Sequence, residues 1–297
     1  MEQPDNLLTK IQEKMDTFSK GQRRIAQFIS EQYDKAAYIT AAKLGKTVGV
    51  SESTVVRFAG ELGYDGYPGM QRALRSMIRT RLTAAQRIEV ASGRIGGGDV
   101  LQKVLDDDIE NIRATLAEID REEFEKITET LVCAQRVYII GVRSSASLAS
   151  FLSFYLNLIL PNVRHVQTST ASELFEQILR IGEGDVLVAI SFPRYSKRTR
   201  KAISYAKSRG AAVVGITDSR NSPIAQEADM SLTAKSDMAS FADSLAAPLS
   251  VINALIASIS MKKEKEVVDT FERLEKIWDE YDVYEKFASE GNTEDKL

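Results

Sequence analysis

Two short segments of the chain combine hydroxyl groups with cationic side chains, and this combination suits a phosphorylated ligand that carries further hydroxyls. They span residues 141–147 and 191–198. Each follows an apolar run typical of a β-strand and opens a helical pattern, and the free amides at a helix N-terminus attract anions. The residues expected to bind the ligand are Ser144, Ser145, Ser191, Arg194 and Ser196. The alternative is that these serines only cap helices, and a cap does not exclude a ligand.

A second functional pattern occupies residues 43–58, where the apolar spacing and a glycine break predict two short helices that meet at a sharp turn. Gly49 is placed in the turn, where a residue without a Cβ takes positive φ at no steric cost. Ser51 is placed to cap the second helix. This helix-turn-helix pattern indicates DNA binding, and the alternative is a tight helical hairpin within a larger core.

The second helix of this pattern presents a polar outer face to the DNA. Arg57 is the best candidate for reading a base edge, because arginine bonds guanine bidentately. The residues expected to contact DNA are Lys43, Lys46, Ser51, Glu52, Ser53, Thr54, Arg57 and Arg72.

The charge distribution agrees with that assignment. Residues 20–87 hold twelve Lys or Arg against five acidic residues, a net of +7, although the whole chain has a formal charge of −3. A basic surface contacts phosphates and releases counterions, which gives affinity independent of sequence.

Composition limits the remaining chemistry. A single cysteine, Cys133, excludes an intramolecular disulfide, and together with the single histidine, His165, it leaves the usual nitrogen and sulfur metal sites without ligands. We therefore expect no metal and no cofactor. We interpret Cys133, which precedes a strand, as a buried small apolar residue rather than a nucleophile, and His165 as structural.

The 297 residues are enough for about two domains of ~100–200 residues each. Helical spacing covers residues 5–32, a further basic helix runs over residues 68–81, and the segment 92–99 is a flexible linker whose Asp99 is placed to cap the next helix. Two helices follow, over residues 99–118 and 121–133.

Beyond these helices, apolar strands alternate with helices. The strands are expected over residues 137–141, 164–166, 185–191, 212–217 and 230–232, and the helices over residues 146–160, 172–180, 196–209 and 223–228. This alternation predicts a parallel sheet covered on both faces, with ligands at the carboxyl ends of its strands. The fold class is therefore α/β overall, an all-α helix-turn-helix domain followed by a doubly wound parallel sheet.

The longest apolar stretch, Leu245 to Ile259, is shorter than the ~20 residues that span a bilayer, so we interpret it as a core helix. The chain starts without the basic and apolar run of a secretory signal. These observations predict a cytoplasmic protein without a membrane partner.

The chain resembles the RpiR-type bacterial transcriptional regulators, which join an N-terminal helix-turn-helix domain to a C-terminal sugar isomerase (SIS) domain. The resemblance rests on residues 50–58 and 62–68 in the first domain and on residues 140–145 and 191–196 in the second. The expected boundaries are 1–80 for the DNA-binding domain, 81–120 for the linker and connecting helix, 121–262 for the SIS domain and 263–297 for a C-terminal helix and tail.

The resemblance implies a regulator of carbohydrate metabolism that binds operator DNA and changes its affinity when a phosphorylated sugar or sugar acid occupies the SIS domain. It also implies a homodimer or homotetramer. Glu173 is similar in placement to an acidic residue of SIS domains and is expected to contact sugar hydroxyls. One departure is that Pro193 and Arg194 replace the inner serine and the glycine that SIS domains commonly carry in the second loop.

Two alternative functions remain open. A sugar-phosphate isomerase with an attached DNA-binding domain needs a general base, a role that Glu173 is placed to take. A bare oligomerisation module would leave the two serine-rich loops without a ligand. Apolar residues at helical spacing from Phe271 to Tyr284 exceed what one small sheet needs, and they favour a homodimer at least.

Overall fold

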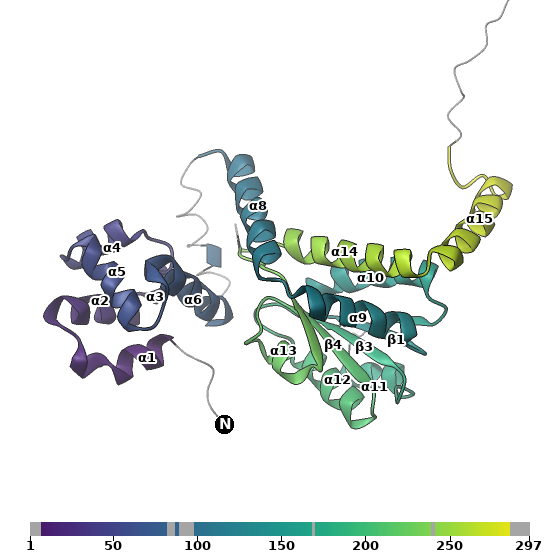
Figure 1. Ribbon diagram of the computed structural model, residues 1–297, viewed down its shortest axis with the longest axis horizontal. Helices are drawn as coiled ribbons and strands as arrows, with labels where there is room; N and C mark the ends of the chain where they lie inside the picture. Colours follow the sequence, from purple (N-terminus) through teal and green to yellow (C-terminus); the bar gives the residue numbers. More distant parts are fainter. Residues whose placement is uncertain (1–6, 82–86, 89–97, 168–169, 239–240, 286–297) are drawn as a thin grey trace, which may run out of the picture.

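The computed structural model describes residues 7–81, 87–88, 98–167, 170–238 and 241–285. It consists of an all-helical N-terminal domain and an α/β C-terminal domain (Figure 1). Most of the expected linker at residues 92–99 lies outside the described residues.

The N-terminal domain consists of short helices around one apolar core. The helices are α1 (Leu7–Glu13), the 3-10 turn η1 (Met15–Thr17), α2 (Lys20–Glu31), α3 (Tyr33–Ala36), α4 (Ala41–Val48), α5 (Glu52–Glu61) and α6 (Gly66–Arg81). Ser19 and Gln22 form a capping box at the start of α2. Ile25, Leu44 and Phe58 are fully buried in the core, which fixes how α2, α4 and α5 pack together.

Helices α8 (Val100–Glu118) and α9 (Arg121–Cys133) lead into the C-terminal domain. Asp99 caps α8 as expected, because its side chain accepts a hydrogen bond from the Gln102 amide. The interpretation of Cys133 as a buried residue is wrong: it ends α9 on the exposed side of that helix. Leu131 is buried and its neighbours Val132 and Ala134 pack partly against the core, whereas Cys133 lies on the opposite face of α9.

A five-stranded parallel sheet forms the centre of the C-terminal domain, with the strand order β2-β1-β3-β4-β5. The strands are β1 (Val137–Gly141), β2 (Val163–Val166), β3 (Val186–Ile190), β4 (Ala212–Thr217) and β5 (Met230–Thr233). The helices between and after them are α10 (Ser145–Ile159), α11 (Ala171–Ile178), α12 (Lys197–Ser208), α13 (Pro223–Glu227), α14 (Ala246–Lys262) and α15 (Glu264–Glu280). The predicted alternation of strands and helices is confirmed.

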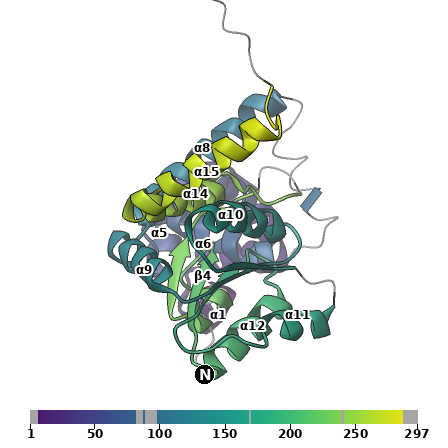
Figure 2. The ribbon, with the colours of Figure 1, turned by 90° about the vertical axis from the view of Figure 1, so that its right-hand side faces the viewer.

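Both faces of the sheet are covered. One core lies between the sheet and α9, α10 and α14, and the other lies between the sheet and α11, α12 and α13. Figure 2 shows α8, α14 and α15 on the side of the sheet opposite to α11 and α12. Helix α14 is the core helix expected from the apolar stretch, with Val251, Ile252, Leu255 and Ile259 buried. Among the described residues, no helix combines the length and the apolar character needed to cross a membrane.

The loop between β5 and α14 packs against the N-terminal domain. The structure describes this loop at residues 234–238 and 241–245. Met238 is buried and belongs to the core cluster of the N-terminal helices. Asn111 of α8 holds the same loop, because its side chain bonds both the carbonyl and the amide of Asp237, at 3.1 and 3.3 Å. Through this loop, the C-terminal domain contacts the N-terminal core directly.

Candidate functional site

The turn between α4 and α5 has the geometry that its sequence predicts. Gly49 ends α4 in the left-handed conformation, with φ of 68°. Ser51 caps α5 through a hydrogen bond from the Thr54 amide. The two helices cross at Gly45, where a Cβ would lie 2.8 Å from the Val50 carbonyl oxygen. Only glycine fits this crossing without a backbone shift.

Seven of the eight expected DNA-contacting residues are exposed, on or beside α4, α5 and α6. Thr54 is half-buried at its flank, and Arg57 lies back along α5 because its Nε donates to the Ser53 carbonyl at 3.3 Å. The exposed members are Lys43, Lys46, Ser51, Glu52, Ser53, Arg57 and Arg72. Lys43 and Lys46 lie on α4, and Arg72 lies on α6.

Sequence reasoning missed two residues that hold α4 and the turn after it in place. Arg24 of α2 donates to the Gly49 carbonyl at 2.9 Å and thereby ties the turn to α2. Tyr67 of α6 donates to the Ile39 carbonyl at 2.8 Å, just before α4 begins. Burial raises the pKa of the Tyr67 phenol to about 12. Neither contact leaves a local signal, because each joins residues about 25 to 28 positions apart.

The two serine-rich loops lie side by side at the carboxyl edge of the sheet. They follow β1 and β3, which are neighbouring strands, and Gly141 at the end of β1 is in register with Ile190 of β3. From β1 the chain runs to β2 on one side of it, and from β2 it crosses back to β3 on the other side of β1. The gap between β1 and β3 is therefore the point where the strand order reverses. Ligands of doubly wound sheets bind at such a point.

The loop after β1 presses closely against the first turn of α10. A Cβ on Gly141 would lie 2.2 Å from the Ser145 carbonyl oxygen, so a side chain cannot fit. Ser145 is buried, whereas Ser144 is exposed and its side chain makes no capping hydrogen bond. The alternative interpretation, that these serines only cap helices, is therefore wrong for Ser144.

In the loop after β3, Ser196 caps helix α12 as the sequence predicts. The Ser196 hydroxyl accepts hydrogen bonds from the amides of Arg198 and Thr199, at 3.2 and 3.3 Å. The Ser196 amide in turn donates to the buried Ser191 hydroxyl at 3.1 Å. The structure thus brings Ser191 and Ser196 into direct contact.

An arginine in the left-handed region occupies each loop. Arg143 has φ of 61° and Arg194 has φ of 59°, and both side chains are exposed. This conformation is uncommon for residues other than glycine, and such strain clusters at functional sites. Arg194 stands where SIS domains commonly carry glycine, and it keeps the backbone conformation that glycine favours.

The loop after β4 also contacts the site, which the sequence did not predict. The Tyr195 hydroxyl donates to the Asp218 carboxylate at 2.8 Å, and Asp218 directly follows β4. Asp218 also accepts from the Thr217 hydroxyl at 3.3 Å. These contacts hold the β3 loop against the next strand, and nothing in the local sequence signals a pair 23 positions apart.

The carboxylate of Glu173 is engaged at the start of α11. Its Oε2 accepts from the Thr170 amide at 3.2 Å, and the Thr170 hydroxyl accepts from the Glu173 amide, which together form a capping box. His165 lies in β2 with its Nδ1 3.0 Å from the Gln167 side-chain nitrogen, and burial lowers the pKa of its imidazole. Among the described residues, no cluster of three or more His, Cys, Asp or Glu is placed to hold a metal ion.

Comparisons with known proteins match each half of the chain. The family described as "Helix-turn-helix domain, rpiR family" matches residues 5–81, and the SIS domain family matches residues 130–258. An uncharacterized HTH-type transcriptional regulator of Caldanaerobacter subterraneus is 26% identical over 285 residues, which cover 92% of this chain and 96% of that protein. The HTH-type transcriptional regulator HexR of Pseudomonas aeruginosa is 25% identical over 270 residues, which cover 87% and 90%.

A solved structure shares the fold over nearly the whole chain. It is the Vibrio vulnificus NanR protein complexed with ManNAc-6P, with a TM-score of 0.57 and 23% sequence identity. The match covers 93% of this chain and 99% of that chain.

Proposed function

Because the chain belongs to the RpiR type, in which an rpiR-family helix-turn-helix domain precedes a SIS domain, we propose that it is a DNA-binding transcriptional regulator of carbohydrate metabolism genes. Its operator affinity is controlled by a phosphorylated sugar or sugar acid in the SIS domain. The observation that carries this proposal is the exposed polar surface of α5, which begins at a glycine turn and a serine cap. The protein acts in the cytoplasm, where its operator lies.

On this proposal, α5 reads the operator in the major groove. The guanidinium of Arg57 contacts a base edge, and Ser51, Ser53 and Thr54 bond bases or nearby phosphates. Glu52 lies on the same exposed face and accepts from a cytosine amino group. The cations Lys43, Lys46 and Arg72 contact phosphates on either side, which sets the register without reading sequence.

The effector binds between the loops after β1 and β3. Ser144, Ser145, Ser191 and Ser196 bond the phosphate or neighbouring hydroxyls, and Arg194 supplies the positive charge. The exposed Ser144 hydroxyl and the two loop arginines support this assignment, because a phosphate group accepts several charge-assisted hydrogen bonds. The complex of NanR with ManNAc-6P supports the choice of ligand class.

We propose that Glu173 reads the sugar and that the protein does not turn it over. Isomerisation needs a base that moves a proton between adjacent carbons. The Glu173 carboxylate accepts a hydrogen bond at the start of α11, and the two relatives named above bear the names of transcriptional regulators.

Control of the operator needs a path from the effector site to α5. An effector shifts an equilibrium only when it binds the two states with different affinities. The loop between β5 and α14 offers this path, because Met238 packs in the N-terminal core while Asp237 is held by α8. The protein acts as a homodimer or homotetramer, so that two reading helices address two half-sites.

The test is a thermal-shift screen of sugar phosphates and sugar acids against the purified chain. A ligand that binds the folded state raises the melting temperature by mass action. We expect a sugar phosphate to give a clear shift and the corresponding unphosphorylated sugar to give none. A screen in which no phosphorylated sugar shifts the protein contradicts the effector assignment, and conversion of an aldose phosphate to a ketose phosphate contradicts the regulator assignment.

A further inference from the structure

The Tyr195 side chain links the loop after β3 to the end of β4. Its hydroxyl donates to the Asp218 carboxylate at 2.8 Å. Asp218 is the first residue after β4 and is only 4% exposed. A buried acceptor that loses a donor destabilises the fold, because water does not replace the lost hydrogen bond. A movement of Tyr195 is therefore felt at Asp218.

Backbone hydrogen bonds continue this contact along the carboxyl edge of the sheet. The Ser191 amide donates to the Ile216 carbonyl at 3.1 Å, and the Ala234 amide donates to the Thr217 carbonyl at 2.8 Å. The loop after β3, the end of β4 and the start of the loop after β5 are thus bonded side by side. Asp218 directly follows Thr217, so a displacement of Asp218 acts on the strand end to which Ala234 is bonded.

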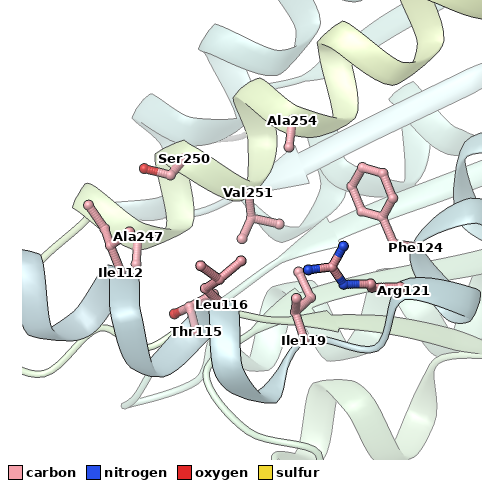
Figure 3. A pocket seen from close by; sticks show the side chains of 10 residues that line it. All are labelled: Ile112, Thr115, Leu116, Ile119, Arg121, Phe124, Ala247, Ser250, Val251 and Ala254. Atoms are coloured by element: carbon pink, nitrogen blue, oxygen red, sulfur yellow. The ribbon is translucent and has the colours of Figure 1, made fainter.

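Helix α8 holds the loop that leaves β5. The Lys235 amide donates to the Thr115 hydroxyl at 2.8 Å, and Asn111 bonds both the amide and the carbonyl of Asp237. Asn111 and Thr115 are 4% and 6% exposed, so this helix buries polar side chains in order to hold the loop. Figure 3 shows Thr115 on the part of α8 that runs beside α14. Residues 234–238 and α8 therefore move as one unit.

The far end of the same segment lies in the DNA-binding domain. Met238 is buried and belongs to the core cluster that contains Leu44 of α4 and Phe58 of α5. It lies four positions after Ala234 in the sequence. A displacement at the end of β4 therefore has a short, hydrogen-bonded route to the helices that carry the expected DNA contacts.

A phosphate group that binds at the loop after β3 competes with the hydroxyls of that loop. The Ser196 hydroxyl accepts from the amides of Arg198 and Thr199. The Ser191 hydroxyl accepts from the Ser196 amide. These amides are the donors that the N-terminus of α12 offers to an anion. An anion that takes them displaces the hydroxyls, and Tyr195, which directly precedes Ser196, moves with the loop.

We propose that Tyr195 and Asp218 are positioning residues that couple the effector site to the DNA-binding domain. Phosphate binding rearranges the loop after β3 and changes the bond between Tyr195 and Asp218. The end of β4 passes this change through Ala234 to Met238. The bond differs between the two arrangements, which gives the effector the unequal affinities that a shift in equilibrium requires. The inference rests on the proposed function and deepens it, because it names the side chains through which the effector acts.

The test uses Tyr195→Phe in the full-length chain, which removes the hydroxyl and keeps the ring. Tyr205→Phe is the matched control, because the Tyr205 hydroxyl donates to the Leu179 carbonyl at 3.4 Å, between α12 and the end of α11. Both rings pack against the same core cluster, so the two variants make the same chemical change in similar surroundings. Thermal denaturation checks that both variants are folded.

Hydrogen–deuterium exchange in the presence of inorganic phosphate follows the coupling without DNA, with chloride at the same ionic strength as the reference. In the wild type and in Tyr205→Phe, phosphate should change the exchange of residues 191–199 and also of residues 234–238. In Tyr195→Phe, phosphate should change the exchange of residues 191–199 alone, because the side-chain link to β4 is missing.

Operator binding gives the second measurement. The duplex is one that the protein selects from a randomised pool, and the sugar phosphate is the one that gives the largest thermal shift in the screen described above. The ratio of dissociation constants with and without this sugar phosphate, at least about fivefold for the wild type, should be lost in Tyr195→Phe and retained in Tyr205→Phe. A purely structural role of Tyr195 predicts a lower melting temperature with the ratio intact.

Three results would overturn the inference while the proposed function stands. The first is a wild type in which phosphate changes exchange at residues 191–199 and not at residues 234–238. The second is a Tyr195→Phe protein that keeps either response, and the third is a Tyr205→Phe control that loses them equally. A wild type in which phosphate leaves residues 191–199 unchanged contradicts the effector site itself, so the two failures are distinguishable.

Discussion

The Arg87 guanidinium lies 3.1 Å from the Asp243 carboxylate, and the two side chains are only 4% and 13% exposed. Arg87 belongs to the segment between the two domains, and Asp243 belongs to the loop between β5 and α14. The same loop carries Met238 into the N-terminal core. This ion pair therefore fastens the inter-domain segment to the loop that contacts the DNA-binding domain.

Asp243→Asn should destabilise the protein by about 3–5 kcal/mol, because it removes the carboxylate that lies beside the buried Arg87 guanidinium. Urea denaturation measures the change. The control is Arg220→Ala, which removes an exposed ion pair with Asp120 and should cost much less. Equal losses for the two variants would contradict a structural role for the buried pair.

Gly141→Ala should abolish the thermal shift given by the effector. The new methyl group would collide with the Ser145 carbonyl and displace the first turn of α10, and with it the serines of that loop. Gly60→Ala is the control, since no atom lies within 4 Å of its added Cβ and alanine is favoured over glycine by about 0.5–1 kcal/mol in a helix. A Gly141→Ala protein that still responds to the sugar would place the pocket elsewhere.

Arg57→Ala and Lys46→Ala should weaken operator binding in different ways. Loss of a bidentate base contact costs about 1–3 kcal/mol and relaxes specificity at one base pair. Loss of a phosphate contact weakens all sequences about equally and reduces the salt slope by about 1. Fluorescence anisotropy over a range of salt concentrations separates the two effects. Identical salt slopes and specificities for the two variants would refute the assigned roles.

The stability of the protein should fall between about pH 10 and pH 12. Burial raises the pKa of folded Tyr67 from 10.0 to about 12, so the unfolded chain loses this proton first as the pH rises. The contribution of protonated Tyr67 to stability is fully present below pH 10 and is lost as the pH rises toward 12. Tyr67→Phe should flatten this part of the stability curve, measured by denaturation at each pH. An unchanged curve would show that Tyr67 is not the group responsible.

The local elements could be predicted because their signals are local. Ser51 and Gly49 mark a turn within three residues, and apolar runs such as residues 186–190 are buried strands whatever surrounds them. Contacts between distant segments could not be predicted in this way. The pairs Tyr195 with Asp218 and Arg24 with Gly49 depend on the packing of elements far apart in the chain.

The candidate effector site shows the same division. The serines after β1 and β3 follow from the rule that ligands bind at the carboxyl ends of parallel strands. The positive φ of Arg194 does not follow, because the backbone conformation of one residue in a loop is set by the neighbours that hold the loop. The exposed side of α9 at Cys133 is likewise decided by which helix face meets the sheet.

The central claim is tested most directly by operator affinity measured with and without a sugar phosphate, on the wild type and on the Ser145→Ala and Arg194→Ala double variant. The operator is a duplex selected by the protein from a randomised pool, and the sugar phosphate is one that shifts the melting temperature of the wild type. We predict that this sugar phosphate changes the wild-type dissociation constant by at least about fivefold, in line with typical coupling free energies, and that the double variant binds the same duplex equally well but does not respond. A wild-type affinity that is the same with and without the sugar phosphate, or a double variant that still responds, would contradict the account.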